Sequence, residues 1–205
     1  MTLDEAIALC PVVAILRGIR PGECLATAQA LHAAGIRVVE VPLSSPQPLE
    51  TISRLAGALG EQLVIGGGTV LTAEAAREVA DAGGRLVVSP ITSRPVIEMA
   101  LRLGMEPAPG VATPTEAFAA LEAGARHLKL FPAASLGPGY LRQLMAVLPG
   151  RAVVWAVGGV GPGDIAAWRE AGAGAFALGA ELYRPGQGAA ETAKKAALAV
   201  AAARA

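Results

Sequence analysis

The sequence predicts a (β/α)₈ barrel, the TIM-barrel class of α/β fold, in which a closed parallel sheet is covered by helices. Eight short aliphatic runs recur along the 205 residues, and segments of helical length rich in Ala, Leu, Glu and Arg separate them. Runs that are apolar on both faces and alternate with helices form parallel sheets. Because the eight units follow one another without a change in composition, we expect one closed barrel domain over residues 1–205 rather than an open doubly wound sheet.

Each aliphatic run predicts one strand. The expected strands are Val12–Leu16, Val38–Leu43, Leu63–Ile65, Leu86–Val88, a weak Glu106–Val111, His127–Phe131, Val153–Val157 and Ala175–Leu178. The clearest helices between them are Glu23–Ala34, Ala73–Ala82 and Glu116–Ala123. Proline suits the first turn of a helix, so Thr113-Pro114, Ser45-Pro46 and Gly161-Pro162 indicate helix starts. We also expect a short N-terminal helix at about residues 3–9 and a C-terminal helix at about 187–204.

Charge and composition favour a metabolic protein of the cytoplasm. Seventeen basic and 17 acidic residues give a formal net charge of zero, whereas a nucleic-acid or anionic-membrane partner calls for a basic excess. No leader-like segment and no apolar run long enough for a membrane span occurs. Cys10 and Cys24 form no CxxC motif, and we expect both to be reduced.

Lys129 lies inside the apolar run His127–Phe131. The chain has three lysines against fourteen arginines, and the other two, Lys194 and Lys195, fall in the C-terminal helix. A lysine kept in an apolar strand indicates a need that guanidinium cannot meet, an amine that can deprotonate and attack a carbonyl. The alternative is a structural lysine that pairs with a carboxylate or points out between strand and helix.

Two further charged residues lie in an expected strand or directly after one. Glu40 is the acid in the middle of Val38–Leu43, and burial would suit its carboxyl to proton transfer; alternatively it only neutralises Lys129. Arg17 follows the first strand, where its guanidinium could bind a carboxylate ligand and lower the pKa of the lysine. A structural ion pair with Glu40 is the other interpretation of Arg17.

Glycine-rich turns follow the last two strands. Phosphates in such barrels often bind there, at bare N–H groups, so Gly158-Gly159 and Gly179-Ala180 predict a phosphorylated substrate. The glycine turns lack the spacing of dinucleotide and P-loop motifs. The histidines lack metal-ligand spacing, and His127 is expected to pack near the start of its strand. We therefore expect neither a cofactor nor a metal.

Several of these segments together resemble a known family. The most specific is Leu128–Ala133, Leu-Lys-Leu-Phe-Pro-Ala, and Val39–Val41, Gly67–Leu71 and the Gly158-Gly159 turn also fit. They resemble the class I aldolases that cleave 2-keto-3-deoxy-6-phospho sugar acids, and the resemblance runs over nearly the whole chain. It implies a lyase with a (β/α)₈ fold that forms a homotrimer.

The resemblance also implies roles for individual residues. Lys129 would form the Schiff base with the keto acid, and Glu40 would act as general acid and base through a water. Arg17 and Thr69 would hold the pyruvate carboxylate, and Phe131 and Pro90 would line the pocket. The phosphate would lie against Gly158, Gly159, Gly179 and Ala180.

The chain departs from the gluconate-type members at two places. The arginine that often follows their glutamate by four residues is absent, because Ser44 stands there, and Arg17 is its natural substitute. Val157 stands where a threonine tends to precede the Gly-Gly turn, and the loss of a buried hydroxyl should change recognition of the sugar C4 hydroxyl. We therefore expect the galactonate epimer as substrate, with pyruvate and glyceraldehyde 3-phosphate as products.

Three alternatives remain open at this point. One is an aldolase for the gluconate epimer or for 4-hydroxy-2-oxoglutarate. Another is a phosphosugar isomerase or synthase with Glu40 as base and a charged Lys129 as acid. The third is a catalytically silent barrel that binds a phosphorylated metabolite.

Overall fold

The protein folds around one parallel sheet. The structure, a computed structural model, describes all residues from 1 to 205. Its strands are β1 (Val12–Ile15), β2 (Val38–Pro42), β3 (Val64–Gly68), β4 (Leu86–Val88), β5 (Glu106–Ala108), β6 (Gly110–Val111), β7 (His127–Leu130), β8 (Val153–Val157) and β9 (Ala175–Leu178). All pair in parallel, in the order β5-β4-β3-β2-β1-β9-β8-β7-β6.

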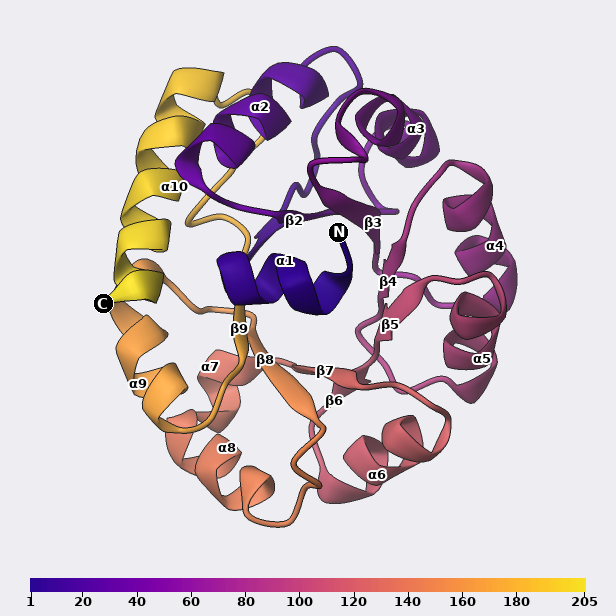
Figure 1. The fold of residues 1–205 in the computed structure, drawn as a ribbon, viewed down its shortest axis with the longest axis vertical. Helices are drawn as coiled ribbons and strands as arrows, with labels where there is room; N and C mark the ends of the chain where they lie inside the picture. The colour runs from indigo at the N-terminus through magenta and orange to yellow at the C-terminus, as the bar shows by residue number, and fades with distance from the viewer.

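Helices alternate with these strands and surround them as a ring (Figure 1). They are α1 (Leu3–Leu9), α2 (Cys24–Ala34), α3 (Pro48–Leu59), α4 (Ala73–Asp81), α5 (Arg94–Arg102), α6 (Pro114–Glu122), α7 (Ala133–Leu136), α8 (Pro138–Met145), the 3₁₀ turn η1 (Pro162–Asp164), α9 (Ile165–Glu170) and α10 (Ala189–Arg204). None of the helices is both long and apolar enough to cross a bilayer.

The sheet closes on itself through an interrupted strand. Only Pro109 separates β5 from β6, and these two segments are the ends of the strand order. The Lys129 N–H donates to the Pro109 carbonyl at 2.8 Å, which joins them to β7. The nine segments are therefore eight barrel strands, and the predicted (β/α)₈ barrel is confirmed. The expected continuous strand Glu106–Val111 is interrupted because proline has no N–H to donate to a neighbour.

The starts of α3 and α10 differ from the prediction by two residues each. α3 begins at Pro48 and not at Pro46, because the hydroxyl of Ser45 accepts the Gly18 N–H at 2.9 Å instead of capping a helix. α10 begins at Ala189, two residues later than expected, because the side chain of Gln187 contacts the preceding loop. The start at Pro114 is confirmed, and Thr113 Oγ1 accepts the Glu116 N–H at 3.3 Å.

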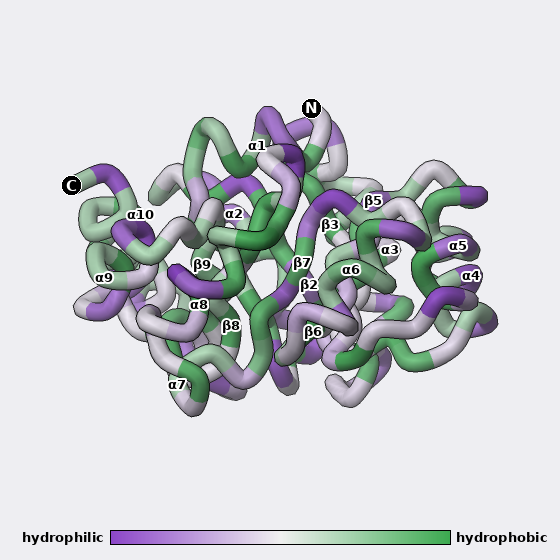
Figure 2. Tube along the Cα trace, turned by 90° about the horizontal axis from the view of Figure 1, so that it is seen from below, coloured by the Kyte–Doolittle hydropathy of each residue, from purple (hydrophilic) through white to green (hydrophobic).

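The apolar core has two parts, one on each side of the sheet. A cluster of 51 residues fills the space between sheet and helices, and 14 residues fill the barrel interior. The interior cluster includes alternate strand residues and also Leu3, Ala6 and Ile7 of α1. The helix α1 therefore closes one end of the barrel, as Figures 1 and 2 show. The opposite, carboxyl end of the strands is the end where barrel enzymes carry their sites.

His127 lies at the closed end, as predicted for a packing residue. Its side chain is buried, Nδ1 accepts the Trp155 indole N–H at 3.1 Å, and Nε2 lies 3.2 Å from an oxygen of Asp4 on α1. Burial lowers the pKa of His127 to about 4, although Asp4 opposes the shift. A neutral imidazole thus connects the barrel interior to the closing helix.

Candidate active site

Strand alternation places the predicted acid and amine inside the barrel. Successive strand residues point to opposite faces, and Ile15, Val38 and Trp155 belong to the interior cluster. Glu40 stands two residues after Val38 on β2, and Lys129 is paired in register with Trp155 across β7 and β8. Both charged side chains are therefore enclosed, with 2% of Glu40 and 5% of Lys129 exposed.

Glu40 occupies a space that Gly68 leaves free. Its Oε2 atom is fully enclosed and has no hydrogen-bond partner. A Cβ atom added to Gly68 on β3 would fall on this carboxyl group. Burial raises the pKa of Glu40 to about 7, and the charges of Lys129 and Arg17 only partly oppose this. A carboxyl with such a pKa can both accept and donate a proton near neutral pH.

Lys129 has no carboxylate in contact. None of the ion pairs within 4.0 Å includes it, and its Nζ lies 4.9 Å from the centre of the Phe131 ring. Burial lowers the pKa of Lys129; the charge of Glu40 raises it again in part, and Arg17 lowers it. The structural alternative of a direct lysine–carboxylate pair is therefore not observed. The geometry instead favours the neutral, nucleophilic amine.

Arg17 lies on the rim of the barrel. Its guanidinium donates to the Ser44 hydroxyl at 3.3 Å, and it makes no direct ion pair with Glu40. The hydrogen bond between Ser45 and the Gly18 N–H holds the loop after β1 against the loop after β2. The arginine thus presents its charge to the cavity from a fixed loop.

A cavity of about 230 Å³ lies beside Lys129 and Arg17. Its walls contain eight of the predicted site residues: Arg17, Lys129, Phe131, Val157, Gly158, Gly159, Gly179 and Ala180. Glu40, Thr69 and Pro90 do not line it. Glu40 is buried below the surface, while Thr69 follows β3 with φ of 57° and Pro90 follows β4, both half-buried.

Two turns in the cavity wall have backbone N–H groups without a partner in the protein. Six residues that line the cavity have backbone N–H groups that donate no hydrogen bond within the protein: Gly158, Gly159, Val160, Gly179, Ala180 and Glu181. Bare N–H groups from two neighbouring turns are typical of an anion site. Gly158 and Gly159 have φ of 94° and 72°, which glycine adopts without strain.

The sequence did not indicate every residue of this site. Gly68 belongs to the segment Gly67–Leu71 that supports the resemblance, but its role depends on the distance to a side chain of another strand. Ile15 and Ala177 complete the apolar wall, and Glu181 places an exposed carboxylate at its edge. Alternation along β1 and β9 could have indicated the first two, whereas Glu181 follows a strand in an irregular loop.

This protein is a barrel with a buried lysine and a buried carboxyl beside a cavity at the carboxyl end of its strands. These features place it in the class of α/β-barrel enzymes. A sequence model of the KDPG and KHG aldolase family matches residues 3–195. The 2-dehydro-3-deoxy-6-phosphogalactonate aldolase of Escherichia coli strain K12 is 47% identical over 187 residues, which are 91% of each protein. The chain belongs to the KDPG and KHG aldolase family, and it is an aldolase, that is, a lyase.

Solved structures support the same family assignment. One described as the native KDPGal structure has a TM-score of 0.93 and 47% identity, covering 95% of this chain and 94% of the other. A KDPG aldolase from Legionella pneumophila, with pyruvate captured as a covalent carbinolamine intermediate, has a TM-score of 0.81 and 25% identity. That alignment covers 99% of this chain and 97% of the Legionella chain.

Proposed function

We propose that the chain is a class I aldolase that cleaves 2-dehydro-3-deoxy-6-phosphogalactonate to pyruvate and D-glyceraldehyde 3-phosphate. The observation that carries this proposal is Lys129, a buried amine without an ion pair beside a cavity that contains free N–H groups. Such a cavity suits a keto acid at one end and a phosphate at the other. The 47% identity to the E. coli galactonate-type aldolase supports the choice of substrate.

In the first half-reaction the neutral amine of Lys129 attacks the C2 carbonyl of the substrate. The carbonyl oxygen takes up a proton, and the resulting carbinolamine loses water to give a protonated imine. Arg17 would hold the carboxylate next to C2 through a two-pronged contact, and Thr69 would assist it. The Legionella structure contains such a carbinolamine, which supports this route for the present enzyme.

In the second half-reaction Glu40 moves the proton. Its carboxylate accepts the proton of the C4 hydroxyl through a water, the C3–C4 bond breaks, and its electrons pass into the imine. Glyceraldehyde 3-phosphate leaves, and Glu40 returns the proton to C3 of the enamine. Addition of water then releases pyruvate and the free lysine. A carboxyl with a pKa of about 7 suits both directions of transfer.

Reductive trapping tests the nucleophile. Borohydride in the presence of pyruvate should attach a three-carbon adduct to Lys129 of the wild type, detectable by mass spectrometry of peptides. Lys129→Ala should give no adduct, and its kcat should fall at least about a thousandfold. Lys194→Ala should keep both the adduct and the wild-type kcat. An adduct that survives Lys129→Ala would place the nucleophile elsewhere, and wild type without any adduct would favour an isomerase or a silent barrel.

We further propose that the enzyme is a homotrimer. Large apolar side chains stay exposed after successive strands and on α6, with Leu71 49%, Ile91 46% and Phe118 41% exposed. Exposed apolar residues of this size are often covered by a second copy of the chain. Light scattering should give about three times the chain mass of 20.6 kDa, and a single-chain mass would contradict the proposal.

We also propose a cytoplasmic location. Cys10 and Cys24 are both buried and unpaired, and burial raises the pKa of both thiols. Cysteines that stay reduced are the norm in the cytoplasm. Fractionation of cells that produce the protein would test this.

A further inference from the structure

The loop between β9 and α10, residues 179–188, carries half of the anion-binding N–H groups. It contains no regular element, and its first turn forms where the Leu182 and Tyr183 N–H groups both donate to the Gly179 carbonyl, at 2.8 and 2.9 Å. Arg184 Nε donates to the Ala180 carbonyl at 3.2 Å. These short-range bonds bend the loop but do not connect it to the rest of the molecule.

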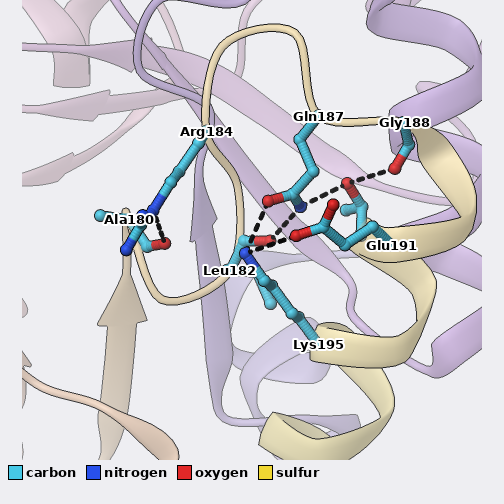
Figure 3. Close-up of polar contacts among 8 residues, drawn as sticks. Ala180, Leu182, Arg184, Gln187, Gly188, Glu191 and Lys195 are labelled. Atoms are coloured by element: carbon cyan, nitrogen blue, oxygen red, sulfur yellow. Dashed lines mark hydrogen bonds and ion pairs between the residues drawn. The ribbon is translucent and has the colours of Figure 1, made fainter.

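Two side chains make that connection. The hydroxyl of Tyr183 donates to Glu23 Oε1 at 2.8 Å, and Gln187 makes the larger set of contacts. The amide of Gln187 donates from Nε2 to the Leu182 carbonyl at 2.9 Å and to Thr192 Oγ1 at 2.8 Å, and its Oε1 accepts from Lys195 Nζ at 2.7 Å (Figure 3). The side chain is 9% exposed. Both N–H groups of the amide and its oxygen are therefore used, which fixes its orientation.

The partners on α10 are themselves held. Lys195 lies 3.1 Å from Glu191, and the Thr192 hydroxyl donates to the Gly188 carbonyl at 3.3 Å. Ala196 and Ala199 of α10 are fully buried against the barrel. Gln187 thus ties a loop carbonyl, two residues after Ala180, to a firmly packed helix.

We propose that Gln187 is a positioning residue for the phosphate-binding turn. By holding the Leu182 carbonyl, its amide keeps the Gly179 and Ala180 N–H groups directed at the cavity. The role needs a donor and an acceptor on one side chain, which glutamine supplies and glutamate does not. The proposal rests on the phosphate site of the proposed function.

Two variants distinguish the effect of losing the amide donor from the effect of changing the side-chain volume. Gln187→Glu keeps the shape but sets an oxygen against the Leu182 carbonyl, and Gln187→Leu removes all three hydrogen bonds. We expect KM for 2-dehydro-3-deoxy-6-phosphogalactonate to rise about tenfold in both, with kcat within about twofold. Inhibition by inorganic phosphate should weaken by a similar factor. The pyruvate concentration that half-saturates borohydride trapping should not change, because pyruvate has no phosphate and is held at Lys129 and Arg17, away from this turn.

Lys194→Met is the matched control, because it removes a cation from the same helix without touching the loop. Its KM should stay at the wild-type value. An unchanged KM in Gln187→Glu would overturn the inference, and so would a parallel loss of pyruvate trapping, which would indicate general destabilisation. If the proposed function is wrong, the wild-type enzyme will release no pyruvate from 2-dehydro-3-deoxy-6-phosphogalactonate. In that case calorimetric titration with inorganic phosphate still tests Gln187, because the dissociation constant must rise in the variants.

Discussion

At the scale of single residues, the site combines two buried groups of opposite charge that do not touch. Burial raises the pKa of Glu40 and lowers that of Lys129, so it brings both groups closer to their neutral forms. Direct contact would have restored both charges, and it would have made the amine a poor nucleophile. The separation of Glu40 from Lys129 is therefore a requirement of the chemistry and not a defect of packing.

Glu40→Gln should remove activity and stabilise the fold. The pKa of Glu40 is raised from its usual 4.5 to about 7. The folded state thus binds the proton more tightly than the unfolded state, and stability falls as the pH rises from 4.5 to 7. At about 1.36 kcal/mol for each pKa unit, the free energy of unfolding of Glu40→Gln should exceed that of the wild type by about 3 kcal/mol at pH 8. Urea unfolding at pH 8 and pH 4.5 checks this, since the gain should vanish at the lower pH.

Gly68→Ala should impair catalysis through Glu40. An alanine Cβ would overlap the Glu40 carboxyl group, which must then turn away from the place where the proton is transferred. We expect kcat to fall at least about tenfold, with borohydride trapping of pyruvate retained because Lys129 is untouched. Gly57→Ala on α3, where nothing lies within 4 Å of the added atom, is the control. Wild-type kcat in Gly68→Ala would show that Glu40 is not the proton carrier.

At the scale of elements, the sequence predicted strands better than the segments between them. A continuous aliphatic run marks a strand that is buried on both faces, and Leu86–Val88, Val153–Val157 and Ala175–Leu178 have the bounds that their runs predict. The start of α3 depended instead on a hydrogen bond between Gly18 and Ser45. Such a contact joins residues 27 positions apart, and no local pattern reports it.

The end of β8 should set the choice of sugar epimer. Val157 lines the cavity immediately before the anion-binding turn, and its isopropyl group can neither donate nor accept a hydrogen bond. Val157→Thr has nearly the same volume and adds a hydroxyl. We expect the ratio of kcat/KM for the gluconate over the galactonate epimer to rise about tenfold. An unchanged ratio, with both activities retained, would mean that another residue recognises the C4 hydroxyl.

At the scale of the whole molecule, the barrel has a cavity end and a closed end, and each end holds a buried group that can change the pH dependence of stability. Glu40 lies toward the cavity, and His127 lies beneath α1 against Trp155 and Asp4. The sequence predicted Glu40 from its place in the middle of an expected strand, and His127 as a packing residue from its place near the start of one. It could not predict that α1 folds across the barrel, because the contact of Asp4 with His127 spans most of the chain.

These two groups should give opposite slopes of stability against pH. The pKa of His127 is about 4 in the fold, below its usual 6.5, so its contribution to stability is present above pH 6.5 and is lost as the pH falls toward 4. Glu40 has the reverse sign between pH 4.5 and 7. Between pH 4.5 and 6.5 the two contributions therefore oppose each other in the wild type.

Single variants should reveal each slope. Glutamine at position 127 can still accept from Trp155 and donate to Asp4 but does not titrate, so His127→Gln should become less stable as the pH rises from 4.5 to 6.5. Glu40→Gln should become more stable over the same range, each change being bounded by about 1.36 kcal/mol for each pH unit. Free energies of unfolding from urea titrations at pH 4.5, 5.5 and 6.5 measure both. Parallel profiles for the two variants would contradict the opposite signs, and the double variant, which lacks both groups, should show neither slope.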